Sequence, residues 1–341
     1  MLNTILKSIL TATVLSMACS TTFATEPEKQ DISMAIGSSI LGYAPVPLAQ
    51  NLGFLKAEGL NVSFENFQAG GSKALQALIG GSVDVVVGSY DHTIQMQAKG
   101  KEIVGIFLLN EVPGITLEVR ADLADKVKSG KDLKGMRLGI TTPGSSTDMI
   151  ARYYVKKSGL AESDVKIIGV GSGAPGMVAL TAKNIDALFS YDPVSTQLMR
   201  KGEAKLLFDA RTVEGSKLAF GGPYPFACVY VTRSFLEKNP ETVQRIANAF
   251  LRTVRWIAAS TPQKIVETLP STSKLGDAEL NAAIWAASKG MFSTTGLFNA
   301  EEVKTPLAVL SGFDPSIASK KIDLSKTYTN RFAEAAAQRV K

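Results

Sequence analysis

The fold is decided by residues 83–91, which read Val-Asp-Val-Val-Val-Gly-Ser-Tyr-Asp, and by their near repeat at residues 185–192, which read Ile-Asp-Ala-Leu-Phe-Ser-Tyr-Asp. A short apolar run that leads into small polar and acidic residues is typical of a buried strand followed by a loop. Each copy comes shortly after an Ala-Leu pair, at residues 77–78 and 179–180. We therefore interpret residues 185–192 as the second occurrence of one structural unit.

The segments before each copy follow the same order. In the first unit we expect a strand at 32–36, a helix ending near 58, a strand at 61–67, a helix at 73–79 and a strand at 83–87. In the second unit we expect a strand at 137–141, a helix at 147–158, a strand at 165–170, a short helix and a strand at 185–189. Strands that alternate with helices predict an α/β fold with a largely parallel sheet in each unit, and ligands at the carboxyl ends of its strands.

Two Gly- and Pro-rich segments, Asn110–Gly114 and Gly221–Pro225, stand beside extended runs and are expected to carry the chain from one unit to the other. We expect two similar lobes joined by a two-strand hinge. The expected division is a signal peptide over 1–24, lobe 1 over 25–112, lobe 2 over 113–226, and a return to lobe 1 over 227–341. The helical C-terminal part is expected to pack on lobe 1.

The composition indicates a globular chain with few groups for catalysis. The 341 residues are 45% hydrophobic and 20% charged, and at roughly 150 residues per domain they suggest two units. One histidine and two cysteines are too few for most zinc or iron–sulfur sites, so we expect no cofactor. They also make a Ser-His catalytic triad hard to build. The net charge of +6 is scattered without a basic stripe, which argues against a nucleic-acid partner.

The first 24 residues have the pattern of a signal peptide. Lys7 precedes the apolar stretch Ile9–Ala18, which is about half as long as a membrane-spanning helix. We expect cleavage after Ala24 and a periplasmic, monomeric protein; the alternative is a lipid anchor at Cys19. Cleavage leaves Cys228 as the single cysteine, which we expect to be a small buried apolar residue.

Gly-Ser-Ser occurs at residues 37–39 and again at 144–146, in equivalent places of the two units. A helix N-terminus offers unpaired N–H groups and a partial positive charge, which suit a carboxylate, sulfonate or phosphate. The simpler alternative is that Ser39 and Ser146 only cap helices. The expected ligand-binding residues are Ser38, Ser39, Tyr43, Gly70, Gly71, Ser89, Asp91, Gly144, Ser145, Ser146, Thr147, Tyr191 and Asp192.

Asp91 and Asp192 end equivalent strands, so their carboxylates can face one cleft. Such a pair can act as acid and base in glycoside hydrolysis, accept a ligand amine, or cap the next helices, and for Asp91 we expect capping. Residues 171–176 match the G-x-G-x-x-G pattern of dinucleotide sites, but the helix that follows is short. His92 is expected to be a partly exposed helix residue rather than a catalyst.

Several segments resemble one family, the solute-binding proteins of bacterial ABC importers of the nitrate, sulfonate, taurine and bicarbonate type, a group that includes thiamine-pyrimidine precursor binders. The matching residues lie in 52–60, 70–84, 133–139 and 186–193. The resemblance implies the periplasmic-binding-protein type II fold, with a ligand clamped between the lobes and delivered to an ABC permease in the inner membrane.

The resemblance also implies roles for particular residues. Residues 144–147 would hold the head group of a small organic anion, such as a sulfonate, amino-sulfonate, carboxylate or aromatic acid, and Asp192 would meet an amine. Tyr191 stands where many relatives carry tryptophan. A fungal branch of the same fold is a thiamine-pyrimidine synthase, but its cysteine-rich tract and histidines are absent from this sequence. We therefore expect a binding protein and not an enzyme.

The signal-peptide hypothesis predicts the N-terminus of the exported protein. Intact-mass spectrometry of protein recovered from the periplasm is expected to give a chain that begins at Thr25 and carries no lipid. A diacylglyceryl mass on Cys19 would instead establish a lipid anchor.

Overall fold

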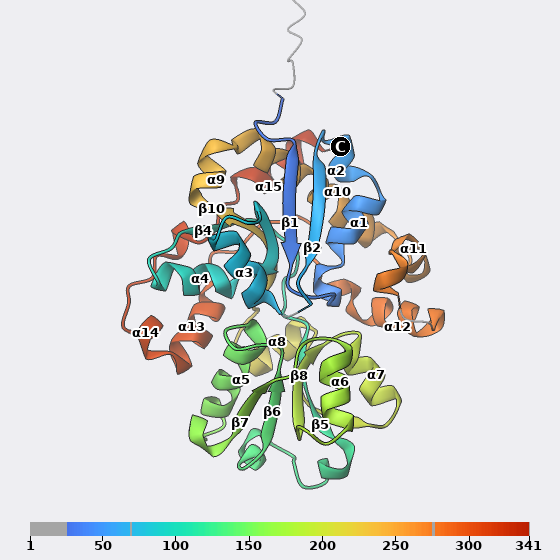
Figure 1. Cartoon of the computed structure of the whole chain (residues 1–341), viewed down its shortest axis with the longest axis vertical. Coiled ribbons are helices and arrows are strands. Elements are labelled where there is room, and N and C mark those ends of the chain that lie inside the picture. The colour runs from blue at the N-terminus through green and yellow to red at the C-terminus, as the bar shows by residue number, and fades with distance from the viewer. Residues whose placement is uncertain (1–25, 69, 275–276, 341) are drawn as a thin grey trace, which may run out of the picture.

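The computed structural model describes residues 26–68, 70–274 and 277–340, and it shows two α/β lobes stacked along the long axis of the molecule (Figure 1). Lobe 1 is built on a sheet of strand order β2-β1-β3-β10-β4, and lobe 2 on a sheet of order β7-β6-β8-β5-β9. The two orders are equivalent, which confirms the two similar lobes. The expected signal peptide, Cys19 and the cleavage site lie outside the described residues.

The strands of the two repeated units lie close to the positions expected from the sequence, whereas the strand at 204–210 was not among those expected. Lobe 1 contains β1 (Asp31–Ile36), β2 (Asn61–Asn66), β3 (Val85–Ser89), β4 (Ile103–Leu108) and β10 (Ala227–Thr232). Lobe 2 contains β5 (Ile115–Arg120), β6 (Arg137–Ile140), β7 (Lys166–Gly169), β8 (Ala187–Tyr191) and β9 (Ala204–Ala210). The repeated stretches form β3 and β8, which are wholly buried because both faces of each sheet are covered.

Each sheet is mixed but largely parallel, as expected, because a single strand in each runs against the others. In lobe 1, β1 is parallel to β2 and β3, whereas β10 is antiparallel to β3 and β4. In lobe 2, β5 is antiparallel to β8 and β9. Both exceptions are strands by which the chain enters a lobe from the other one. They begin at the cleft and run away from it, whereas the strands beside them end there.

Two connections form the hinge. The first is residues 109–114, and the second is residues 211–226, which include α8 (Val213–Phe220). The connections are hydrogen bonded where the chain crosses, because the Phe226 N–H donates to the Asn110 carbonyl at 2.9 Å. The expected lobe boundaries, 112/113 and 226/227, fall within the first connection and at the end of the second; their exact positions stay predictions.

Helices cover both sheets. Lobe 1 carries α1 (Pro45–Asn51), α2 (Phe54–Ala57), α3 (Gly71–Ile79) and α4 (Asp91–Ala98), and lobe 2 carries α5 (Ser146–Lys157), α6 (Ala174–Thr181), α7 (Val194–Arg200) and α8. The C-terminal helices are α9 (Arg233–Lys238), α10 (Pro240–Ala259), α11 (Pro262–Thr268), α12 (Ala278–Ser288), α13 (Lys304–Phe313), α14 (Pro315–Ala318) and α15 (Arg331–Arg339). The expected helix ending near 58 is divided into α1 and α2 at Gly53, whose φ of 71° lies in the left-handed region.

The C-terminal helices pack mainly on lobe 1, as expected. Helix α10 lies against α1, α2 and α15, and buries Ile246, Phe250 and Val254. Helix α13 additionally contacts α5 of lobe 2, so the C-terminal part touches both lobes. Cys228 is buried in β10, as expected.

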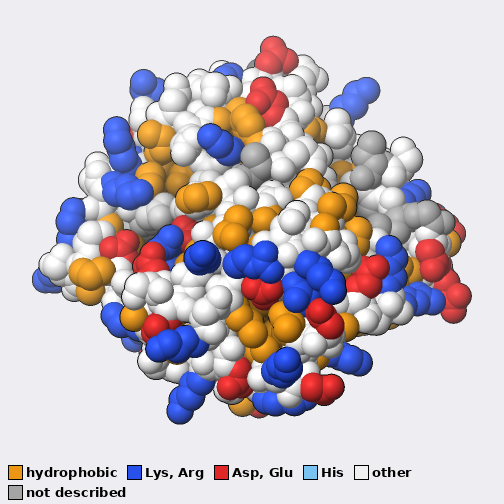
Figure 2. All heavy atoms as spheres, turned by 60° about the horizontal axis from the view of Figure 1, so that its bottom comes forward, with side chains coloured by type: hydrophobic (Ala, Val, Ile, Leu, Met, Phe, Trp, Pro, Cys, Tyr) orange, Lys and Arg blue, Asp and Glu red, His pale blue; other side chains and the backbone are white. Residues whose placement is uncertain are grey.

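The surface at the lobe 2 end has mixed charge. Figure 2 shows lysine and arginine side chains among aspartate and glutamate side chains on this face, with hydrophobic side chains between them. The exposed large hydrophobic residues of lobe 2 are Val178, Leu206, Val213 and Leu218. Among the described helices, none is both long and apolar enough to cross a membrane.

Candidate functional site

A small chamber between the lobes brings together most of the expected ligand-binding residues. This narrow space is lined by Ser38, Ile40, Tyr43, Gly70, Gly71, Thr141, Ser145, Ser146, Thr147 and Tyr191. All of these except Ile40 and Thr141 were expected from the sequence. We call this space the inner chamber. It lies where the carboxyl ends of strands from both sheets meet, which is the usual position of a ligand site in an open α/β sheet.

Two helices point their N-termini at the inner chamber, one from each lobe. Helix α3 begins at Gly71 and helix α5 begins at Ser146. The first N–H groups of a helix have no acceptor within the helix and carry part of its positive dipole. The chamber therefore presents backbone donors from both sides.

Gly70 allows the two lobes to approach each other this closely. Its φ is 86°, a left-handed conformation, and a Cβ atom there would lie 2.9 Å from Thr141 Oγ1 of lobe 2. Next to it, the Ser72 hydroxyl lies 2.8 Å from the Thr142 hydroxyl across the cleft. A side chain at position 70 would thus hold the lobes apart.

Asp91 is the buried centre of the contact between the lobes. Its Oδ1 accepts a hydrogen bond from the Ser146 hydroxyl of lobe 2 at 3.1 Å, and its Oδ2 accepts one from the Tyr224 hydroxyl of the second hinge connection at 3.0 Å. The expectation that Asp91 caps α4 is wrong, because Tyr90 occupies the N-cap position and the carboxylate points toward lobe 2 instead. Burial, and then the negative charge of Asp91, raise the pKa of Tyr224 far above its usual range.

The serine-rich loop before α5 is held by its own hydroxyl groups. The hydroxyls of Thr141, Ser145 and Thr147 lie 2.8 to 2.9 Å from one another, and Ser145 also donates to the Thr142 carbonyl at 2.7 Å. Ser145 is the N-cap of α5, and so the cap is one residue earlier than Ser146. This leaves the Ser146 side chain to reach across the cleft.

Asp192 lies at the edge of the cleft with both carboxylate oxygens engaged. Oδ1 accepts from the Thr196 N–H at 3.0 Å and from the Thr196 hydroxyl at 2.6 Å, while Oδ2 accepts from the Arg211 guanidinium at 3.3 Å. These bonds fix the first turn of α7. The contact of Asp192 with a ligand amine stays a prediction, and it would have to compete with Arg211.

Three other expected residues lie around the inner chamber without lining it. Ser39 is exposed and caps no helix; its hydroxyl accepts from the Asn66 side-chain amide at 2.7 Å. Ser89 is fully buried at the end of β3, and its hydroxyl has no partner among the described residues. Gly144, with a φ of 76°, donates from its N–H to Asp148 at 2.8 Å, and thus shapes the loop before α5.

His92 contradicts its expected exposure, because it is fully buried beside the site. Its Nδ1 lies 3.2 Å from the Tyr230 hydroxyl, and Nε2 has no partner among the described residues. Burial lowers the pKa of the imidazole, which favours the neutral form. The ring packs against Gly71, where a Cβ atom would lie 2.9 Å from it. The sequence shows neither Tyr224 as a neighbour of Asp91 nor Tyr230 as a neighbour of His92, because both contacts are made only in the folded chain.

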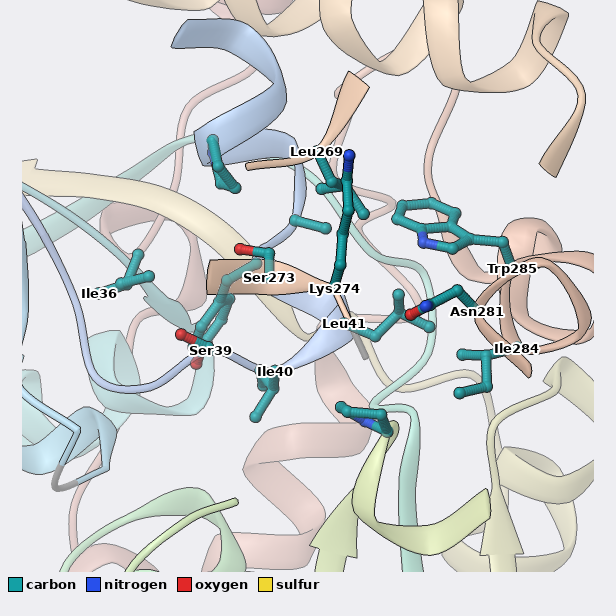
Figure 3. Close-up of a pocket in the computed structure, with 14 residues that line it drawn as sticks. Ile36, Ser39, Ile40, Leu41, Leu269, Ser273, Lys274, Asn281, Ile284 and Trp285 are labelled. Carbon is teal, nitrogen blue, oxygen red and sulfur yellow. The ribbon is translucent and has the colours of Figure 1, made fainter. Parts of the chain in front are cut away.

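Two further spaces share Ile40 with the inner chamber as a lining residue. The first, a narrow lower chamber, lies against lobe 2 and is lined by the 171–173 loop together with Ser190 and Asp192. The second, a side chamber of about 120 Å³, lies toward α12 and is mostly apolar (Figure 3). The G-x-G-x-x-G segment therefore faces the cleft, at the start of a helix of only eight residues.

The chemistry that these residues offer is binding by neutral donors. No cluster of metal-ligating side chains occurs in the described part of the chain. The two carboxylates considered for glycoside hydrolysis, Asp91 and Asp192, are each held by hydrogen bonds from protein groups. What remains at the inner chamber is N–H groups, hydroxyls and the rings of Tyr43 and Tyr191.

A glutamate that is buried beneath the cleft had not been predicted from the sequence. Glu118 is fully buried in β5, where Oε2 accepts from the Ser190 hydroxyl at 2.9 Å. Burial raises its pKa to about 7, although the nearby hydroxyls of Thr116, Ser195 and Ser190 oppose the shift. The signal for it was a single acidic residue inside the apolar strand Ile115–Arg120.

Comparison with known proteins places the chain in a family. The NMT1/THI5-like family matches residues 42–265, which is well over half of the chain, and the chain belongs to this family. YtlA of Bacillus subtilis (strain 168) is 23% identical over 237 residues, or 67% of this chain and 66% of that protein. The 4-amino-5-hydroxymethyl-2-methylpyrimidine phosphate synthase of Aspergillus parasiticus is 23% identical over 300 residues, or 85% of this chain and 83% of that enzyme.

Solved structures have the same fold. A protein from Bordetella bronchiseptica RB50 is 37% identical, with a TM-score of 0.88 over 92% of this chain and 99% of that one. The alkanesulfonate-binding protein SsuA from Xanthomonas axonopodis pv. citri, bound to MOPS, is 19% identical, with a TM-score of 0.72 over 89% of this chain and 99% of that one. Both matches confirm the expected two-lobed fold.

The raised pKa of Glu118 predicts a pH-dependent stability. Between pH 4.5 and about 7, Glu118 keeps its proton in the folded chain and loses it in the unfolded chain. The contribution of the neutral carboxyl to the free energy of unfolding is therefore present at low pH and is lost as the pH rises through about 7. Relative to Glu118→Gln, the wild type should lose on the order of 3 kcal/mol of unfolding free energy across this window. Urea unfolding at pH 4.5 and pH 8 measures it.

Glu65→Gln, at an exposed position of β2, is the control for the loss of one acidic side chain. If the difference between wild type and Glu118→Gln is the same at both pH values, Glu118 does not titrate in this window.

Proposed function

We propose that this member of the NMT1/THI5-like family is an exported, noncatalytic solute-binding protein, which closes its two lobes on a small organic anion and delivers it to an ABC permease in the inner membrane. The observation that carries the proposal is the inner chamber, to which both lobes contribute a helix N-terminus and hydroxyl groups. Neither lobe alone completes it, so a ligand there gains its full set of contacts only when the lobes meet.

The donors at the chamber suit an anionic head group. A sulfonate or carboxylate can accept from the first N–H groups of α3 and α5, and both helix dipoles favour negative charge there. The Ser146 hydroxyl donates to Asp91 in this structure, so it must turn toward the head group to take part. Because every donor at the chamber is neutral, the anionic head group is held by hydrogen bonds and dipoles and not by an ion pair.

Asp91 favours ligands that carry a positive group as well. No lysine or arginine of the described residues forms an ion pair with this carboxylate, which lies just behind Ser146. A purely anionic ligand is repelled by it, whereas an amine near Asp91 is attracted. Among the candidate ligands, an amino-sulfonate or amino acid matches both the helix N-termini and Asp91.

The comparisons support a periplasmic transport role over an enzyme. The structural neighbour SsuA is by its name an alkanesulfonate-binding protein, and its fold covers most of this chain. The second candidate is an enzyme on the same scaffold, which is favoured by the similarity to the pyrimidine phosphate synthase. The two candidates differ in outcome, because a binding protein releases its ligand unchanged and a synthase converts its substrate.

We further propose that the protein acts as a monomer.

A ligand panel separates the two candidates. Thermal unfolding of the purified mature chain is measured with alkanesulfonates, taurine, carboxylates, nitrate and a pyrimidine, and each compound is afterwards recovered for mass analysis. A true ligand at 100 times its Kd raises the unfolding free energy by about 2.7 kcal/mol. We expect stabilisation by at least one organic anion, which is recovered intact. Stabilisation by no anion, together with conversion of the pyrimidine, would establish the enzyme.

A matched pair of variants on α5 tests the position of the site. Ser146→Ala should weaken binding of the stabilising anion by roughly 1 to 3 kcal/mol, the scale for a lost hydrogen bond to a charged group. Ser158→Ala, at the other end of the helix, removes a hydroxyl that bonds only the Tyr154 carbonyl and should leave binding unchanged. Isothermal titration calorimetry measures both, and equal affinities for the two variants would place the site elsewhere.

A further inference from the structure

A layer of buried polar side chains lies beneath the cleft, between the sheet of lobe 2 and helix α7. Thr116 and Glu118 of β5 share one face of the sheet with Ser190 of β8, because Thr116 stands opposite Ser190 in the pairing of these strands. Helix α7 packs on β8 and β9 and contributes Ser195, whose hydroxyl lies near Glu118. All four side chains are at most 7% exposed. We call these four residues the polar layer.

The polar layer is incompletely hydrogen bonded. Glu118 Oε2 accepts from the Ser190 hydroxyl at 2.9 Å, but Glu118 Oε1 and the Ser195 hydroxyl have no hydrogen-bond partner among the described residues. An ionised carboxylate away from water needs several donors, whereas a neutral carboxyl needs fewer and donates one bond itself. The geometry therefore suits a neutral Glu118, in agreement with its raised pKa.

Ser190 connects the polar layer to the cleft. Its hydroxyl bonds Glu118, and the residue also lines the lower chamber. The next two residues of the chain continue toward lobe 1, because Tyr191 lines the inner chamber and the Asp192 carbonyl accepts from the Leu41 N–H at 3.1 Å. A change at Glu118 can thus reach the cleft through a single side chain.

The protonation state of Glu118 determines what Ser190 can offer to the cleft. An ionised Glu118 only accepts, so it holds the single O–H of Ser190. A neutral Glu118 can donate its own proton to Ser190 Oγ, and the Ser190 O–H is then free to turn toward an acceptor in the lower chamber. The neutral form also removes a negative charge from beneath the cleft. Both changes favour an anion between the lobes.

The surrounding charges leave Glu118 without a compensating cation. The charged residues on the elements around it are Asp192, Asp209, Arg211 and Arg120, together with the exposed Arg200 and Lys205. Arg211 pairs with the two aspartates, at 3.3 Å to Asp192 and 2.7 Å to Asp209, and Arg120 pairs with acidic residues at the end of β5 away from the cleft. No basic residue in the described part of the chain forms an ion pair with Glu118.

We propose that Glu118 is a positioning residue that couples anion binding to pH: its neutral form lets Ser190 donate toward the cleft, and its ionised form holds that hydroxyl and repels the anion. This inference rests on the proposed function. It means that the protein binds its anion more tightly in a mildly acidic medium than in a mildly alkaline one. Because coupling is reciprocal, the anion in turn favours the neutral carboxyl, and a proton is taken up with it near pH 7.

Calorimetry on the full mature chain at pH 6 and pH 8.5 tests the coupling. The probes are methanesulfonate, nitrate and propionate, which are ionised at both pH values. The wild type should bind an anion on the order of tenfold more tightly at pH 6, which corresponds to a rise of one unit in the pKa of Glu118 on binding. Glu118→Gln, which is neutral and similar in shape, should bind equally at both. His92 does not interfere, because burial lowers its pKa and keeps the imidazole neutral.

Proton uptake is a second measurement, and it needs no variant. The heat of binding at pH 7 is compared in phosphate and Tris buffers, whose ionisation enthalpies differ, and the difference gives the number of protons bound with the anion. The wild type should take up a fraction of a proton, and Glu118→Gln none. If Glu118→Gln does not fold, uptake by the wild type supports the coupling, and its absence overturns it.

Glu65→Gln is the matched control, since it makes the same chemical change at an exposed position of β2 in lobe 1. It should keep the pH dependence of the wild type. Binding at pH 6 shows that Glu118→Gln is folded. An anion that the wild type binds equally at both pH values, or a pH dependence that survives in Glu118→Gln, would overturn the coupling and leave the proposed function intact. Binding of none of the three anions at either pH would contradict both.

Discussion

The buried carboxylate of Asp91 is the constraint on which the arrangement of the lobes depends. It joins α4 of lobe 1, the N-terminus of α5 in lobe 2 through Ser146, and the second hinge connection through Tyr224. A carboxylate away from water is costly unless it is hydrogen bonded, and in this arrangement the two hydroxyls supply those bonds. Separation of the lobes removes Ser146 and admits water in its place. The interaction can therefore form and break with modest net cost as the cleft closes and opens.

The topology explains why such a carboxylate stands at the cleft. In each lobe the strands that precede the cleft loops run toward it, and the strand that arrives from the other lobe runs away from it. This places the ends of β3 and β8, and the loops before α3 and α5, around one space. The two hinge connections lie side by side through the bond from Phe226 to Asn110, so the lobes can rotate about a short axis without losing either sheet.

Much of this arrangement could be predicted because the fold repeats. The near-identical ends of β3 and β8 located the cleft, and the serine-rich loops identified most of the residues that line the inner chamber. The errors concern contacts between distant parts of the chain. Asp91 was expected to cap α4, since a local cap is the common role of an aspartate there, but Ser146 and Tyr224 bind it from lobe 2 and the hinge. His92 has a polar sequence environment, and its burial follows from packing against Gly71 and Tyr230. The side chamber was beyond prediction for the same reason, because α12 meets α1 only in three dimensions.

In the proposed function, the ligand binds between the lobes and draws them together. Small-angle X-ray scattering of the mature chain, with and without a saturating anion identified by calorimetry, measures this most directly. We expect the radius of gyration to decrease when the ligand is added. A radius of gyration that stays the same at saturation would contradict closure, even for a ligand whose binding is certain.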